Sequence, residues 1–269
     1  MGISNQFHFE WLDEAMAPIR DGVRLSLPKR PQVLGIGEQG PSPFINHLLE
    51  GMDYSYQACD LFPLSPEVLV CDMNDLSPLF GKIHADIATL FRASYFIKNK
   101  HSFFEQIKQV LVPEGILCMD LLIGSSDLPV LDFRYGERRA AISYDEERTA
   151  YYQTSFFDDR LLREFPEQIE AFCRHARRWP LETKLNYLRQ APRFFWRDVR
   201  ALRRLRPENL AAAIRAALPE ENIFSLRDFE QAGFEILTFN ARYFYPKVKK
   251  FNLYCYVAAR LKKAEASGS

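Results

Sequence analysis

Apolar and polar residues follow two different rhythms between residues 31 and 124. Short apolar runs, typical of strands, alternate with stretches in which apolar residues recur at helical spacing. The strands predicted in this way are residues 32–36, 54–60, 68–71, 86–90 and 115–123. Helices are predicted at residues 7–27, 43–50 and 100–111. This alternation is typical of a parallel sheet covered by helices, and the long apolar run at 115–123 suits a strand buried on both faces.

The pattern changes after residue 124. Residues 125–224 are rich in arginine and aromatic residues and read as mostly helical. A helix then begins after Ser225, which suits an N-cap, and ends at Gly233. Strands are predicted at residues 234–244 and 251–261. Because their connection is too short for a helical crossover, we expect them to pair as an antiparallel hairpin.

The sequence therefore predicts an α/β protein with a doubly wound, mostly parallel sheet of seven strands and an antiparallel last strand. Three parts are expected along the chain. Residues 1–30 form an N-terminal helical segment, residues 31–124 and 225–262 form the core, and residues 125–224 form a helical insertion.

A glycine-rich turn follows the first predicted strand. Gly35, Gly37 and Gly40 have the spacing Gly-x-Gly-x-x-Gly, and Asp60 ends the next strand. Glycines let the backbone approach a ligand closely, and a carboxylate accepts hydrogen bonds from ribose hydroxyls. The turn alone fits a nicotinamide dinucleotide as well as another nucleoside cofactor.

The stretch HADIATLFRASYFIKNKHSFFEQIKQVLVPEGILCMDLLIG resembles the second half of a class I S-adenosylmethionine-dependent methyltransferase core. In that family the fourth strand begins with Asp, here Asp86, and the next helix ends in a Val-Leu-x-Pro-Gly-Gly turn, here residues 110–115. The stretch SLRDFEQAGFEIL and the closing hairpin resemble the family's last helix and antiparallel final strand. The resemblance covers residues 31–124 and 225–262 and implies S-adenosylmethionine as the cofactor.

The resemblance also implies the cofactor-binding residues. Asp60 would bind the ribose, and the turn would hold the methionine end of the cofactor. Leu61 would pack on the adenine, Asp72 and Met73 would lie near its edge, and Leu90 lies at the end of the fourth strand. The full set of implied cofactor-binding residues is Gly35, Gly37, Glu38, Gly40, Asp60, Leu61, Asp72, Met73 and Leu90. Asp72 equally suits a helix cap.

The turn departs from the family pattern at three positions. Gly35 stands where an Asp or Glu is usual, while Gln39 and Pro41 replace two glycines. Glu38 is a substitute for the missing carboxylate, although on an extended backbone its side chain would point the other way. These departures favour a second hypothesis, a protein of the same fold that binds the cofactor weakly or not at all and serves as a binding or scaffolding partner.

Candidates for substrate contact lie in two places. Phe91, Arg92 and Tyr95 follow the fourth strand, where ligands sit in such sheets. The insertion lies on the substrate side in this fold, so we expect it to form a lid that contributes Tyr152, Arg197 and Arg200. Transfer from a sulfonium needs mainly alignment and exclusion of water, and no residue stands out as a general base.

The insertion carries a local excess of positive charge. Between residues 174 and 206 there are eleven Lys and Arg against Glu182 and Asp198, a net of +9. Three interpretations stay open: a solvated helix whose arginines pair with acidic clusters at 145–147 and 158–159, recognition of a carboxylated or phosphorylated acceptor, and contact with an anionic membrane.

Composition narrows the setting. The 35 basic and 35 acidic residues balance, so the whole-chain charge gives no reason to expect nucleic acid. The five cysteines are scattered and form no Cys-x-x-Cys pair, which argues against a disulfide framework or a metal site and favours the cytoplasm.

We expect methyl transfer to a small, aromatic or anionic metabolite. A nicotinamide oxidoreductase, which leaves residues 100–124 unexplained, and nucleic-acid methylation through the arginine-rich insertion are weaker alternatives.

Overall fold

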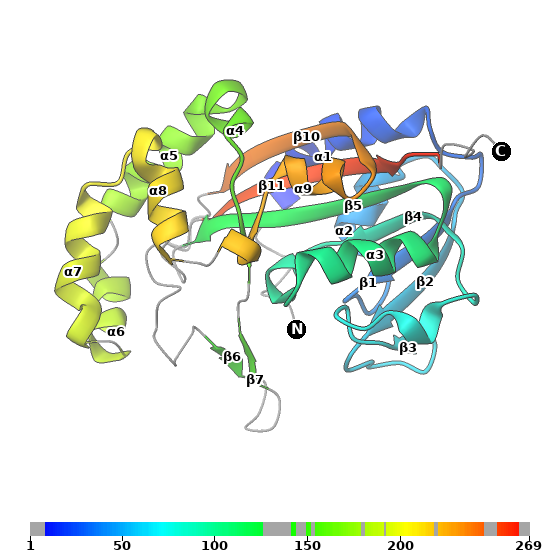
Figure 1. Ribbon diagram of the computed structural model, residues 1–269, viewed down its shortest axis with the longest axis horizontal. Helices are drawn as coiled ribbons and strands as arrows, with labels where there is room; N and C mark the ends of the chain where they lie inside the picture. Colours follow the sequence, from blue (N-terminus) through cyan, green and yellow to red (C-terminus); the bar gives the residue numbers. More distant parts are fainter. Residues whose placement is uncertain are drawn as a thin grey trace. The chain divides into compact units, whose positions relative to one another are not determined.

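The computed structural model describes residues 9–125, 141–143, 149–151, 154–178, 181–190, 192–217, 220–244 and 252–263 (Figure 1). The chain divides into two compact units. The first comprises Met1–Asp120, Leu226–Asn240 and Tyr256–Ser269, and the second comprises Leu121–Ser225 and Ala241–Cys255.

A sheet of seven strands forms the centre of the fold. Its strands are β1 (Gln32–Ile36), β2 (Ser55–Asp60), β3 (Leu69–Val70), β4 (Ala85–Leu90), β5 (Leu111–Ser125), β10 (Phe234–Phe244) and β11 (Asn252–Leu261). They are arranged in the order β10-β11-β5-β4-β1-β2-β3. The pairs β1–β2, β1–β4, β2–β3 and β4–β5 are parallel, and the C-terminal strands are antiparallel. This confirms the predicted seven-stranded, mostly parallel sheet.

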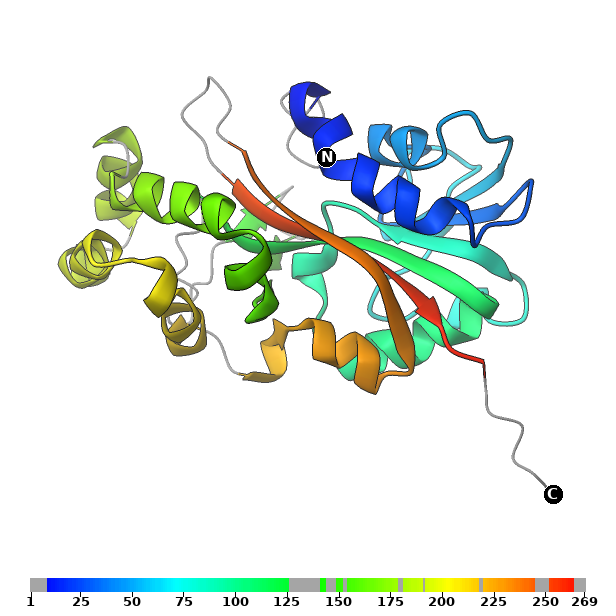
Figure 2. The ribbon, with the colours of Figure 1, turned by 90° about the horizontal axis from the view of Figure 1, so that it is seen from above.

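Helices cover both faces of the sheet within the first unit. They are α1 (Phe9–Arg24), α2 (Pro43–Leu48), α3 (Lys100–Val110) and α9 (Leu226–Gln231), with 3-10 turns η2 (Ser77–Leu79) and η3 (Ser94–Phe96). Figure 2 shows α1 and α2 on one face and α3 and α9 on the other. The predicted apolar stripe of α3 is buried, and the Phe104 ring packs against Phe229 of α9 with centroids 4.9 Å apart.

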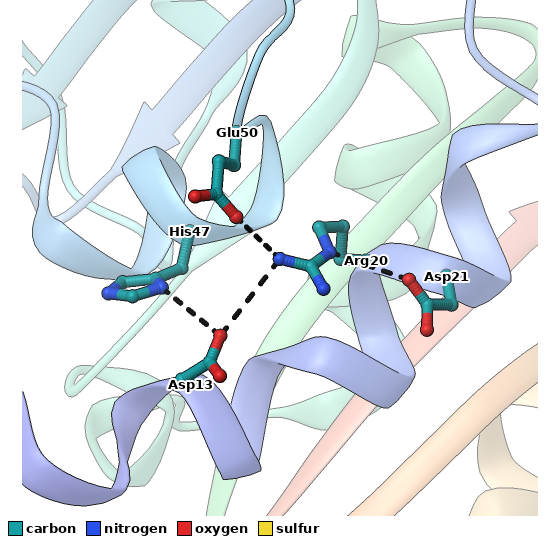
Figure 3. A network of polar contacts seen from close by, with 5 residues as sticks. All are labelled: Asp13, Arg20, Asp21, His47 and Glu50. Carbon is teal, nitrogen blue, oxygen red and sulfur yellow. Dashed lines mark hydrogen bonds and ion pairs between the residues drawn. The ribbon is translucent and has the colours of Figure 1, made fainter.

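A polar network joins α1 to α2 at the surface (Figure 3). Arg20 Nη1 lies 2.6 Å from Glu50 Oε2 and 3.9 Å from Asp13 Oδ1, which in turn lies 3.7 Å from His47 Nδ1. The carboxylates are exposed to water, so each pair contributes about 0–1 kcal/mol. The network therefore orients α1 more than it stabilises the fold.

The turn predicted within residues 110–115 forms a bulge in β5, which is longer than the predicted strand. Ala85 pairs with Leu111 and Ile87 with Ile116, so three extra residues are accommodated on β5 between these pairs. Glu114 takes a positive φ of 64° there. β5 therefore begins at Leu111, before the predicted start at residue 115, because it pairs with β4 both before and after the bulge.

The second unit contains the helical insertion. Its helices are α4 (Arg160–Glu164), α5 (Pro166–Arg177), α6 (Leu181–Gln190), α7 (Pro192–Arg203) and α8 (Pro207–Ala217), with the 3-10 turn η4 (Glu220–Asn222). Short strands that the helical pattern did not predict are also present. β6 (Ala141–Ser143) pairs antiparallel with β7 (Thr149–Tyr151), and β8 (Ser155–Phe156) pairs parallel with β9 (Ile223–Phe224).

Candidate functional site

The carboxyl ends of the parallel strands bring several predicted residues together. Ligands bind at this edge in open α/β sheets. A methyl group placed on Gly37, which follows β1, would lie 3.1 Å from Ala93 Cβ, 3.3 Å from Met73 Cε and 3.9 Å from Leu90 Cδ1. The structure thus gathers Gly37, Met73 and Leu90 at one point, although they lie far apart in the sequence.

Gly37 is required by the turn itself. Its φ is 69°, a region that favours glycine, and its N–H donates to the carbonyl of Cys59 on β2 at 2.8 Å. Because Ala93 and Met73 fill the space where a side chain would stand, only glycine fits at this position without displacing them. Gly40 differs, since a methyl group placed there would meet no atom within 4 Å.

Tyr56 fills the space that a side chain at Gly35 would enter, and it contacts Glu38. A Cβ on Gly35 would fall 2.0 Å from the Tyr56 hydroxyl, which donates to Glu38 Oε2 at 3.1 Å and to the Gly40 carbonyl at 3.0 Å. The prediction that Glu38 would point away from this side was wrong. The positive φ of Gly37 interrupts the strand alternation and turns the next side chain inward.

The Glu38 carboxyl is buried, with 7 % of the residue exposed. Burial raises its pKa from 4.5 to about 8, against the opposing effect of the hydrogen bond from Tyr56. Its Oε1 atom is buried and has no hydrogen-bond partner among the residues that the structure describes. The turn therefore holds a carboxyl group that is neutral at pH 7 and becomes charged if a cation approaches.

Asp60 ends β2 at the same edge. Its Oδ1 accepts the backbone N–H of Phe62 at 2.7 Å, which orients the carboxylate within the loop. Gln39 holds this loop from the other side, since its amide donates to the Phe62 carbonyl at 3.1 Å and accepts the Leu64 N–H at 2.8 Å. Leu61 and Phe62 are exposed. A carboxylate and two apolar side chains suit a ribose and the base attached to it.

Asp72 has a local structural role. Its Oδ1 accepts the backbone N–H of Asn74 at 2.9 Å and the Asn74 side-chain amide at 3.0 Å. This is a side-chain turn of the kind that Asp favours, and it positions the neighbouring Met73. No contact in the structure tests the role of Asp72 toward the adenine, which stays a prediction.

Arg92 is held by a buried acidic partner that the sequence analysis did not single out. Its backbone N–H donates to Asp120 Oδ1 at 2.7 Å, its Nε lies 3.4 Å from Asp120 Oδ2, and its Nη2 donates to the Tyr256 hydroxyl at 3.1 Å. Burial raises the pKa of Asp120 to about 6 despite the nearby guanidinium. A single Asp inside the apolar run GILCMDLLIG was the available signal.

Aromatic rings surround this ion pair. The Arg92 guanidinium lies 5.0 Å from the centre of the Phe44 ring, which stacks on Phe91 at 5.0 Å. Tyr95 is buried beside Phe96, with ring centroids 4.6 Å apart. Of the predicted substrate residues, Phe91, Arg92 and Tyr95 thus belong to one packed region of the first unit, which positions Arg92 chiefly through protein contacts.

The remaining predicted substrate residues belong to the second unit. Tyr152 lies outside the described residues, and so does the side chain of Arg197, whose backbone is part of α7. Arg200 is exposed on the same helix. Their role toward a substrate stays a prediction.

The strand order differs from that of the dinucleotide-binding fold. In the dinucleotide-binding order the sixth strand follows the fifth in space. Here β11, the last strand of the chain, lies between β5 and β10. This seven-stranded order with antiparallel C-terminal strands is consistent with the methyltransferase fold.

The chain has distant structural neighbours among methyltransferases. The chain is similar to a 1,6-didemethyltoxoflavin-N1-methyltransferase from Burkholderia thailandensis (14 % identity over 96 % of this chain and 84 % of that one, TM-score 0.42). It is also similar to a methyltransferase from Methanosarcina mazei (12 %, 90 % and 97 %, 0.41) and to the N-methyltransferase NodS from Bradyrhizobium japonicum (10 %, 97 % and 99 %, 0.41). No protein-family model and no curated protein matches the chain. At these identities and scores the neighbours say nothing about the substrate.

The described residues contain neither a cluster suited to a metal ion nor a membrane-spanning helix. No group of three His, Cys, Asp or Glu side chains suited to a metal ion occurs in the described ranges. None of the helices described is both long and apolar enough to cross a bilayer.

Proposed function

We propose that this protein binds S-adenosylmethionine at the carboxyl ends of β1, β2 and β4 and transfers its methyl group to a small, aromatic or anionic molecule. The observation that carries the proposal is the meeting of the Gly37 turn with Met73 and Leu90 at the carboxyl edge of the sheet. Open α/β sheets bind their ligands at this edge.

Two carboxyl groups fit the polar ends of that cofactor. Asp60 is placed to accept hydrogen bonds from ribose hydroxyls, and Leu61 is exposed beside it for contact with the base. Glu38 offers the buried Oε1 to the methionine ammonium group and takes the place of the acidic residue absent at position 35. A cation beside Glu38 would lower its pKa, so cofactor binding should release a proton near neutral pH.

The protein's contribution to the reaction is positional. S-adenosylmethionine supplies a methyl group on a positively charged sulfur that leaves as a neutral thioether. Proximity and exclusion of water then account for most of the acceleration. Phe91 and Tyr95 add apolar, buried surface near the carboxyl end of β4.

A second candidate function, cofactor binding without catalysis or a scaffolding role, is favoured by Gln39. This residue replaces a glycine of the family turn and uses both ends of its amide to tie the turn to the loop after β2. A side chain at a position where the family has glycine leaves less room for a ligand beside the backbone. The two functions differ in whether the cofactor binds and in whether its methyl group is transferred.

Calorimetry tests cofactor binding directly. We expect S-adenosylmethionine and S-adenosylhomocysteine to bind and NADH to give no heat. Asp60→Ala should weaken both nucleosides by about 1.5–3 kcal/mol, the scale of a hydrogen bond to a charged group. Asp53→Ala is the matched control, since this exposed Asp precedes β2, at the opposite edge of the sheet. Heat from NADH alone, or equal affinities for both variants, would contradict the proposal.

A further inference from the structure

The exposed face of α6 is apolar. Leu181, Leu185 and Leu188 are 71 %, 45 % and 36 % exposed, and their spacing of four and three residues places them on one side of the helix. Lys184 and Arg189 border this stripe. A surface helix ordinarily turns such a stripe toward the core, so leucines that face water indicate a surface used for binding.

The neighbouring helix α7 presents a tryptophan in the same way. Its apolar residues Phe195, Val199 and Leu202 are buried, while Trp196 is 66 % exposed and is followed by the exposed Arg200 and Arg203 at positions i+4 and i+7. The two helices contact each other and lie side by side in Figure 1. Leucines, a tryptophan and cations therefore occur together on one helical hairpin of the second unit.

Positive charge dominates this hairpin. Residues 181–206 contain eight basic residues (184, 189, 193, 197, 200, 203, 204 and 206) and two acidic ones (182 and 198), a net of +6 in a chain whose total is zero. Asp158, one of the acidic residues expected to neutralise the arginines, pairs instead with Arg160 at 3.0 Å. This ion pair engages Asp158 with an arginine outside the hairpin.

We propose that the outward residues of α6 and α7 bind the surface of an anionic lipid membrane. The α6–α7 surface consists of Leu181, Lys184, Leu185, Leu188, Arg189, Trp196, Arg200 and Arg203. Leucine and tryptophan enter the boundary between headgroups and acyl chains, and Lys and Arg remain at the phosphates. The helices lie in the plane of the interface, since neither is long or apolar enough to span the bilayer.

Charge and apolarity together select this partner. An RNA or DNA strand would use the arginines, but exposed leucines add nothing to phosphate or base-edge contacts. An acidic protein would use the arginines too, yet anionic lipid matches both the charge and the exposed apolar side chains of the hairpin. The proposal does not depend on which cofactor the first unit binds.

Sedimentation of the full chain with lipid vesicles tests the proposal. We expect binding to vesicles containing about one third phosphatidylserine and no binding to pure phosphatidylcholine, with the affinity falling as salt rises above about 0.1 M. Replacing Arg200 and Arg203 by Gln should weaken binding by roughly 10- to 30-fold. Replacing Leu181 and Leu185 by Ser should weaken it at least about tenfold through lost apolar burial.

Matched controls distinguish the role of the α6–α7 surface from that of exposed charge or exposed apolar residues elsewhere on the chain. Arg24→Gln with Arg227→Gln removes two exposed arginines from the first unit, and Leu25→Ser with Val70→Ser removes two exposed apolar residues there. Both control pairs should bind vesicles as the unchanged chain does. Circular dichroism of each variant establishes that it has folded.

The outcomes decide between partners. Loss of vesicle binding in both α6–α7 variants, with the controls unaffected, supports the proposal. Failure of the unchanged chain to bind anionic vesicles overturns it. It is also overturned if only the arginine variant loses binding. A further contradicting result is that the chain binds polyuridine as tightly as vesicles while the leucine variant binds both normally. In either case the surface would be purely electrostatic.

Discussion

Glu38 is a buried carboxyl group at the centre of the proposed site. Its pKa of about 8 arises from burial, and the groups around it are Tyr56, Ser42, Asp120 and Tyr54. A carboxyl whose pKa is higher in the folded than in the unfolded chain binds more protons when folded. The stability that Glu38 contributes should therefore be complete below pH 4.5, decline as the pH rises toward 8, and stay lost above that.

Glu38→Gln should remove this pH dependence, because the amide is neutral at every pH and keeps a similar shape. We expect the free energy of unfolding of the unchanged protein to fall by a few kcal/mol between pH 6 and 8, and that of the variant to fall distinctly less. Urea unfolding at several pH values measures it. Asp120, with a pKa of about 6, contributes its own decline mainly below this window. Parallel slopes for the two proteins would show that Glu38 is already ionised in the fold.

At the residue scale, the sequence identified positions better than orientations. Gly37, Met73 and Leu90 were predicted and do meet, because strand ends in a parallel sheet share an edge. The orientation of Glu38 was missed because one positive φ reverses the alternation, and no pattern of residue types encodes that reversal. Tyr56 was missed because it pairs with Val33 and reaches Gly35 only diagonally across the two strands, a contact that no local pattern of residues predicts.

The turn between β1 and α2 depends unequally on its glycines. Gly37→Ala would place a methyl group 3.1 Å from Ala93 Cβ at a φ of 69°, so we expect it to cost about 1–2 kcal/mol of stability and to weaken nucleoside binding. Gly40→Ala is the control for the stability effect alone, because the space around Gly40 is open and its φ is not positive. Thermal unfolding and calorimetry measure both effects. If the two variants behave alike, the turn does not owe its shape to Gly37.

At the element scale, strands and helices of the first unit were predicted within a few residues, since apolar runs and helical stripes report burial directly. The bounds of β1 and β10 match, whereas β5 begins earlier than predicted because pairing resumes across a bulge. The short strands β8 and β9 could not be foreseen. Their pairing joins Phe156 to Phe224, and such distant partners leave no local pattern.

At the scale of the whole molecule, the chain divides its predicted residues between two units. The proposed cofactor residues lie in Met1–Asp120, whereas Arg197, Arg200 and the α6–α7 surface belong to Leu121–Ser225. The strand order, with the last strand inserted beside β5, depends on a pairing across more than a hundred residues. The short connection between the last two strands predicted their antiparallel pairing, whereas the place of β11 beside β5 is not encoded in any local pattern.

Because the proposed cofactor site lies in one unit, cofactor binding should raise the Tm of that unit. A ligand that binds only the folded state at one hundred times its Kd adds about 2.7 kcal/mol, which raises the Tm of a unit this size by roughly 5–10 °C. We expect S-adenosylhomocysteine to produce that shift in calorimetric scans and NADH to produce none. Because the proposed binding residues all belong to the first unit, any second transition should stay in place. Asp60→Ala should need a roughly 10- to 100-fold higher ligand concentration for the same shift. A shift caused by NADH, or one that moves only a transition of the second unit, would place the nucleoside elsewhere and remove the basis for methyl transfer at the carboxyl ends of β1, β2 and β4.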